Sequence, residues 1–186
     1  MIKTSEIEFT DEQSQLLDIA ENFCKEKSPI AAVRNQIETE DGFETSLWKE
    51  MAELGWFGVA IPEEFGGSGL GIGEVVALTE PMGRALFATP FASTTLAAQL
   101  LIDAGTNAQK EEYLPRIAQG SITALAMSEE HGDWDLTNIS CTAKLDHDQL
   151  ILSGTKTLVG DAKIAETIIA TVKYRGSSAL VVINRA

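Results

Sequence analysis

Hydrophobic residues recur at the three- and four-residue spacing of a helix from the N-terminus to about residue 120. In the first helix Thr10 and Gln13 form a capping box, and Leu16, Ala20 and Phe23 then share one face. Proline, glycine and a second capping box divide the chain beyond this helix, because proline and glycine interrupt helices. We therefore expect helices at 11–27, 31–37, 45–54, 72–86, around 96–101 with Gly105 closing it, and from 107 to Pro115, which ends or kinks the last one.

Beyond residue 120 the pattern changes to the alternation of a strand. Ile139, Cys141, Ala143 and Leu145 alternate with polar residues, and a polar turn at 146–148 leads into QLILSG as the partner strand. The segments SITALAMS, TIIATVKY and ALVVIN are three further strand candidates.

Helices followed by strands, without βαβ alternation, predict an α+β fold. We expect an all-helical N-terminal domain at 1–120 followed by a partial antiparallel β-domain at 121–186. The chain stops straight after a strand pattern, and an uncovered sheet edge promotes aggregation. We therefore expect this sequence to be part of something longer.

The composition restricts the classes of partner and site. The 186 residues include 14 basic and 28 acidic ones, which gives a net charge of −14. Nucleic acids and anionic membranes need a basic face, so neither is expected as a partner. No stretch approaches the about 20 apolar residues of a membrane span, and no signal peptide is evident, which predicts a cytoplasmic protein. Cys24 and Cys141 lie in hydrophobic patterns and are expected to be buried, while His131 and His147 lack partners at metal spacing, so no metal site is expected.

The segment PEEFGGSGLG at 62–71 has two interpretations. Glycine-rich loops can cradle phosphates, but the dinucleotide fingerprint needs glycine at i, i+2 and i+5, and from Gly67, Gly69 and Gly71 the third position is not glycine. No Gly-Lys-Ser/Thr follows either. A connector between two helices is therefore the favoured interpretation.

Two stretches carry a resemblance to a known family. LWKEMAELGWFGVAIPEEFGGSGLGIGEVVALTEPMGRAL (47–86) and QKEEYLPRIAQGSITALAMSE (109–129) resemble the N-terminal helical domain of the acyl-CoA dehydrogenase family and its first β-strand, in the family's order. The resemblance covers essentially the whole chain. It implies a helical domain, a middle β-domain and a C-terminal helical bundle, with FAD between the last two.

The resemblance also implies the chemistry. A glutamate base removes the α-proton of an acyl-CoA thioester, hydride passes from the β-carbon to flavin N5, and electron-transfer flavoprotein usually reoxidises the flavin. The base lies in the C-terminal part, which this sequence does not contain, so no catalytic residue is expected here. We expect the chain to be inactive alone and to work in a homo- or hetero-oligomer.

Two flavin signatures assign the candidate site residues. The first, normally Thr-Glu-Pro, a Gly/Ala-rich turn and Ser-Asp, here reads MSEEHGDWD (127–135). The resemblance implies that Met127 and Ser128 contact the flavin, and that Trp134, which replaces the serine, lies at the substrate. The second reads GTKTLVGD (154–161) and implies flavin contacts by Val159 and Gly160. Here Leu158 replaces the family's tryptophan, and Gly160 its threonine.

These departures leave alternatives open. A divergent FAD-dependent dehydrogenase is one, a non-catalytic subunit or fragment of a hetero-oligomeric dehydrogenase is another, and a flavin monooxygenase of the same superfamily is a third. The acids of the first signature, Glu129, Glu130, Asp133 and Asp135, could form a base or metal site, but a solvated turn is the favoured interpretation.

Overall fold

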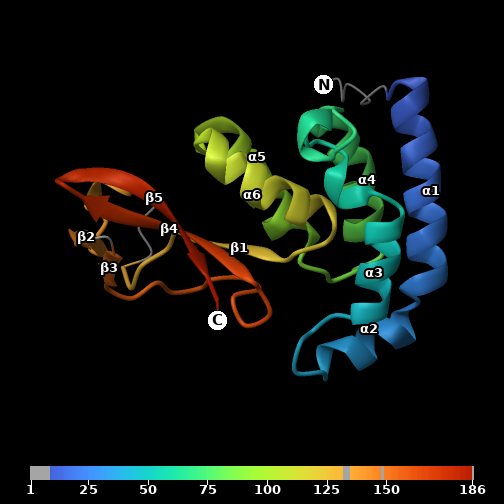
Figure 1. Ribbon diagram of the computed structural model, residues 1–186. Coiled ribbons are helices and arrows are strands. Elements are labelled where there is room, and N and C mark those ends of the chain that lie inside the picture. The colour runs from blue at the N-terminus through green and yellow to red at the C-terminus, as the bar shows by residue number, and fades with distance from the viewer. Residues whose placement is uncertain (1–8, 132–134, 148, 186) are drawn as a thin grey trace, which may run out of the picture. The chain divides into compact units, whose positions relative to one another are not determined.

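The computed structural model describes residues 9–131, 135–147 and 149–185 and divides into two compact units, Met1–Thr89 and Pro90–Ala186 (Figure 1). The first unit is helical. Its elements are α1 (Asp11–Lys27), α2 (Ile30–Ile37), α3 (Thr45–Glu53), the 3₁₀ turns η1 (Trp56–Gly58) and η2 (Glu63–Phe65), and α4 (Ile72–Arg84).

The helix caps expected from the sequence are confirmed in the first unit. Thr10 accepts a hydrogen bond from the Gln13 amide at 3.2 Å, and the Gln13 side chain accepts from the Thr10 amide, which completes the capping box of α1. Gln13 Nε2 also donates to Glu74 at the start of α4, at 3.2 Å. The cap therefore joins α1 to α4 as well as starting α1.

The interior of the first unit is aromatic. Trp48 and Trp56 are both buried, and they pack against Phe57 and Phe23 respectively. Cys24 is also buried, and that burial raises the pKa of its thiol to about 11. These side chains serve packing.

The glycine-rich segment is a connector whose amides are already used. The amides of Ser68, Gly69 and Leu70 donate to the carbonyls of Gly58, Ile61 and Val59 at 2.9–3.0 Å. A Cβ on Gly67 would lie 2.0 Å from the Ile61 carbonyl oxygen, so the close approach requires glycine. Amides that pair with carbonyls cannot cradle a phosphate, and the favoured interpretation holds.

The second unit begins with two helices, α5 (Phe91–Ala104) and α6 (Asn107–Ala118). Within this unit α5 lies against α6 and the first strand (Figure 1). Of the two outcomes expected at Pro115, the end of the helix is not observed, because α6 continues to Ala118 with Pro115 inside it. Proline removes only its own amide bond, and one short turn after it is held by the remaining bonds.

Five strands complete the second unit: β1 (Thr123–Ala126), β2 (Thr142–Asp146), β3 (Gln149–Ser153), β4 (Thr167–Tyr174) and β5 (Ser177–Asn184), with the 3₁₀ turn η3 (Leu136–Asn138) between β1 and β2. β5 pairs antiparallel with β4 along its whole length. β1 and β2 share the other edge of β4, and β3 forms a hairpin with β2.

The sheet is mixed, so the expectation of an antiparallel β-domain is corrected. Both β1 and β2 run parallel to β4. The chain leaves β1, makes the β2–β3 hairpin and returns to β4, and strands that are not joined by a tight turn are free to pair in parallel.

The change from helix to strand falls between Ala118 and Thr123, where the hydrophobic pattern changes. The division into domains at 1–120 and 121–186 stays a prediction. Of the helices in the described ranges, none has the length and apolar character that crossing a membrane requires.

Candidate functional site

The two flavin signatures meet at Lys156 in the second unit. Its ammonium donates to the Met127 carbonyl at 3.2 Å, to Glu129 at 2.8 Å and to the Thr171 hydroxyl at 2.7 Å. The Thr157 amide donates to the Ser128 carbonyl at 2.9 Å. One largely buried cation therefore fixes the peptide that follows β1 against the loop that follows β3.

Glu129 is a structural carboxylate. Its side chain is only 15% exposed and accepts hydrogen bonds from Lys156 and from the amides of Ser140 and Cys141, at 2.7 and 3.0 Å. Burial opposes its ionisation, but these donors outweigh burial and hold the pKa of Glu129 well below its ordinary value. The favoured interpretation of this acid as part of a solvated turn is therefore wrong for Glu129.

The loop at 154–161 is anchored at both ends. Gly154 has φ of 142° and lies so close to Cys141 that a Cβ would be 2.4 Å from its sulfur. At the other end Asp161 accepts a hydrogen bond from Ser93 of α5. The anchors fix the loop relative to β2 and α5.

The predicted site residues occupy different environments. Met127 is exposed, and Ser128 is half-buried with a hydroxyl that has no hydrogen-bond partner within the described part of the chain. Val159 packs against the core of the sheet, whereas Gly160 is exposed with open space above its Cα. Trp134 lies outside the described residues.

Leu158, which replaces the family's tryptophan in the second signature, has an unusual exposure and backbone conformation. Its side chain is 92% exposed and its backbone is left-handed, with φ of 51°. A bulky residue in that conformation stores strain of about 1–2 kcal/mol. The loop therefore presents an apolar side chain to whatever contacts this face.

An apolar groove of 680 Å³ adjoins the first signature. Met127 forms part of its wall, and the other lining side chains come from α5, β1, η3, β4 and β5. Leu96, Leu100, Leu125, Leu136 and Leu180 make it mostly apolar, and Gln99, Asp103, Thr171 and Ser178 are its polar members. A groove of this size and character suits an extended aliphatic group.

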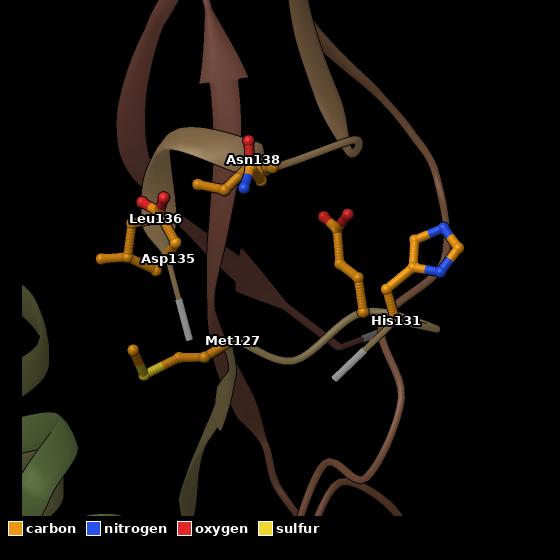
Figure 2. Close-up of a pocket in the computed structure, with 7 residues that line it drawn as sticks. Met127, His131, Asp135, Leu136 and Asn138 are labelled. Atoms are coloured by element: carbon orange, nitrogen blue, oxygen red, sulfur yellow. The ribbon is translucent and has the colours of Figure 1, made fainter. Parts of the chain in front are cut away.

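A much smaller pocket of 50 Å³ is lined by residues of the first signature and of η3. Figure 2 shows His131 on one side of it, Asp135, Leu136 and Asn138 on the other, and Met127 at its edge. Its volume suits a few water molecules. His131 is exposed, and Asp135 caps the Thr137 amide at 2.9 Å. Within the described ranges, no group of three or more histidine, cysteine or acidic residues is placed to hold a metal ion.

The geometry suits one edge of a flavin ring. The Ser128 hydroxyl is available, the Met127 and Ser128 carbonyls are fixed by Lys156 and Thr157, and Gly160 leaves open space. Hydrogen-bonding groups held rigidly beside an apolar groove are what a planar cofactor with one polar edge requires.

The fold and these signatures define an acyl-CoA dehydrogenase-type domain. The family model described as "Acyl-CoA dehydrogenase, N-terminal domain" matches residues 10–121. The chain belongs to the acyl-CoA dehydrogenase family, whose members are oxidoreductases and in general FAD enzymes.

Individual relatives agree with this assignment. The acryloyl-CoA reductase (NADH) of Anaerotignum propionicum is 33% identical over 174 residues, which cover 90% of this chain and 43% of that protein. The mitochondrial isovaleryl-CoA dehydrogenase of Arabidopsis thaliana is 32% identical, over 92% of this chain and 43% of its own. A solved structure described as a Tcur3481-Tcur3483 steroid ACAD variant superposes with a TM-score of 0.86 at 30% identity, covering 94% of this chain and 48% of that one. The chain thus spans less than half the length of the curated relatives it matches.

Proposed function

We propose that this chain supplies one side of the active site of an FAD-dependent oxidoreductase that acts on the CH–CH bond of acyl-CoA thioesters. The groove takes the acyl chain, and Met127, Ser128, Val159 and Gly160 contact the flavin, with Trp134 near the substrate. FAD, when bound, accepts or donates the hydride. The chain's own residues bind the acyl chain, fix the ring edge and exclude water from one side.

One observation carries the proposal. Met127 belongs both to the peptide held by Lys156 and to the wall of the apolar groove. An acyl chain in this groove would therefore lie beside the Met127 peptide, which belongs to the first flavin signature. Oxidation across two adjacent carbons needs that proximity, because the chain and the ring must be aligned before hydride can pass.

Further parts of the proposal are the partners and the location. Acyl-CoA is the substrate, electron-transfer flavoprotein the electron acceptor, and the chain works in the cytoplasm within a homo- or hetero-oligomer. The relative described as Tcur3481-Tcur3483 is named as a pair, which supports a hetero-oligomer. Leu158 and Gly160, which replace the family's flavin-contacting tryptophan and threonine, favour a second candidate function. In that function the chain is a non-catalytic subunit that binds a partner chain more strongly than it binds flavin.

The groove is tested by placing a charge in it. Leu180→Asp is expected to weaken octanoyl-CoA binding by about 10-fold or more, because the acyl chain loses an apolar contact and meets a carboxylate. Leu180 is 38% exposed, so the variant is expected to fold. The measurement is isothermal titration calorimetry with short, medium and long acyl-CoAs.

Leu150→Asp is the matched control, because Leu150 is also a strand leucine, 42% exposed, and lies in β3 outside the groove. It is expected to leave the affinity unchanged. If the two variants bound octanoyl-CoA with equal affinity, the groove would not be the acyl-binding site.

A further inference from the structure

A second concave site lies in the second unit, where β2 and β4 separate. β2 pairs with β4 only through Thr142–Lys173 and Ala143–Tyr174, whereas its other edge stays paired with β3 as far as Asp146. The wedge between the diverging strands has a volume of 560 Å³ and is lined by residues 142–145 and 173–176.

Three cations line this wedge: Lys144, Lys173 and Arg175. The parallel register places Thr142 and Lys173 on one face, and Lys144 shares that face because it follows Thr142 by two residues. The chain has only 14 basic residues among 186 and is acidic overall. No acidic residue of the described ranges lines the wedge, so the wedge is a positively charged region of an acidic chain.

The cations are available to a ligand. Among the residues that the structure describes, none of the three forms a salt bridge, and all three side chains are exposed. The nearest acid along β2 is Asp146, which pairs with His147 at 2.9 Å in the following turn.

The tip of the β4–β5 hairpin adds a second element. The Arg175 guanidinium lies 5.1 Å from the centre of the Tyr174 ring, in cation–π contact. Arg175 is in the left-handed region with φ of 51°, and Gly176 follows with φ of 85°. Beyond Ala143 the inner edge of β2 has no strand partner in the described ranges, which leaves backbone polar groups along the wedge.

From this arrangement we propose that the wedge binds the phosphate groups of a small phosphorylated ligand. Lysine and arginine supply charge-assisted hydrogen bonds to phosphate oxygens, and all three cations line the same concave wedge. The overall charge of −14 repels a long polyanion, but its effect falls off over about 8 Å at physiological salt. A compact di- or triphosphate therefore fits better than a nucleic acid.

The wedge adjoins the acyl groove along β4. Thr171 lines the groove, and Lys173 is two residues further on the same strand and face, about 7 Å away. A molecule with an apolar chain and a phosphorylated head could reach both. The identification of that head as the phosphates of a CoA thioester rests on the proposed function, whereas the phosphate site itself does not.

The test compares two double variants of the 186-residue chain that lose the same charge. Lys144→Met with Lys173→Met removes the wedge lysines, and Lys25→Met with Lys49→Met removes two exposed lysines of the first unit. Inorganic pyrophosphate binding is measured by calorimetry, with thermal melting to confirm that both variants fold. The wedge variant is expected to bind on the order of 10-fold more weakly than the wild type, and the control within about 2-fold.

CoA is the second probe and identifies the source of the phosphate. If CoA binds more tightly than pyrophosphate, and the wedge variant loses this difference, the ligand is a CoA thioester. If CoA and pyrophosphate bind equally, the ligand is a free phosphate compound. Leu180→Asp separates the two proposals, because it is expected to weaken octanoyl-CoA binding while pyrophosphate binding is unchanged. The phosphate site is overturned if the wild type does not bind pyrophosphate, or if the wedge variant binds it as the control does.

Discussion

Replacing Lys156 with methionine is expected to lower the free energy of unfolding of the second unit by about 3–5 kcal/mol. The side chains of Lys156 and Glu129 are 10% and 15% exposed, so the variant leaves a buried carboxylate without its counter-charge. It also removes a donor from the Met127 carbonyl and the Thr171 hydroxyl. The measurement is urea denaturation followed by circular dichroism.

Two further variants make the result specific to the buried pair. Adding Glu129→Gln to Lys156→Met is expected to recover part of the loss, because the uncompensated charge is removed. Arg116→Met breaks an exposed pair with Glu112 in the same unit and is expected to cost at most about 0.5 kcal/mol. A Lys156→Met variant as stable as Arg116→Met would contradict the role of the pair.

The same pair sets a pH dependence. The pKa of Glu129 lies below its ordinary value of 4.5 in the folded chain, so its contribution to stability is complete above that value and is lost as the pH falls below it. The difference in stability between the wild type and Glu129→Gln should therefore be constant above about pH 5 and should shrink in more acidic solution.

Local sequence signals predicted the helices well because each signal acts within a few residues. The capping boxes at Thr10 and Thr106 follow from spacing alone. Parallel pairing of β1 and β2 with β4 could not be predicted, because strand alternation does not encode which strands become neighbours.

The site was predictable only where the resemblance supplied a residue. It pointed to Met127 and Ser128, but it did not show that Glu129 and Lys156 join the two signatures, since they are 27 positions apart. Glu129 and Lys156 both match the family's flavin signatures and both lie just after a predicted strand. That shared position is the signal that could have suggested the pair. The groove depends on several elements that meet only after folding, so no periodicity reveals it.

The 186-residue chain is expected to show no acyl-CoA-dependent dye reduction above background, even with added FAD. Dehydrogenation needs a base at the α-carbon while the β-carbon faces flavin N5, with both enclosed. Glu129 cannot act as that base, because Lys156 and two amides occupy its oxygens. The measurement is steady-state dye reduction with short, medium and long acyl-CoAs.

Asp103 provides the decisive variant, since it is the acidic residue among the described residues that line the groove. Robust turnover by a chain of confirmed mass would contradict the expectation. If Asp103→Asn then abolished that turnover, Asp103 would be the base, and the site would be more complete than we propose.

The most direct test of the central claim, that the groove beside Met127 holds the acyl chain, is a methyl NMR titration. The chain has four methionines, of which Met51 and Met82 are buried in the first unit, whereas Met127 is 40% exposed and lines the groove. With ¹³C-methyl methionine, octanoyl-CoA is expected to shift the Met127 signal, assigned by Met127→Leu, and to leave those of Met51 and Met82 in place. A Met127 signal that stays fixed while octanoyl-CoA binds would contradict the account.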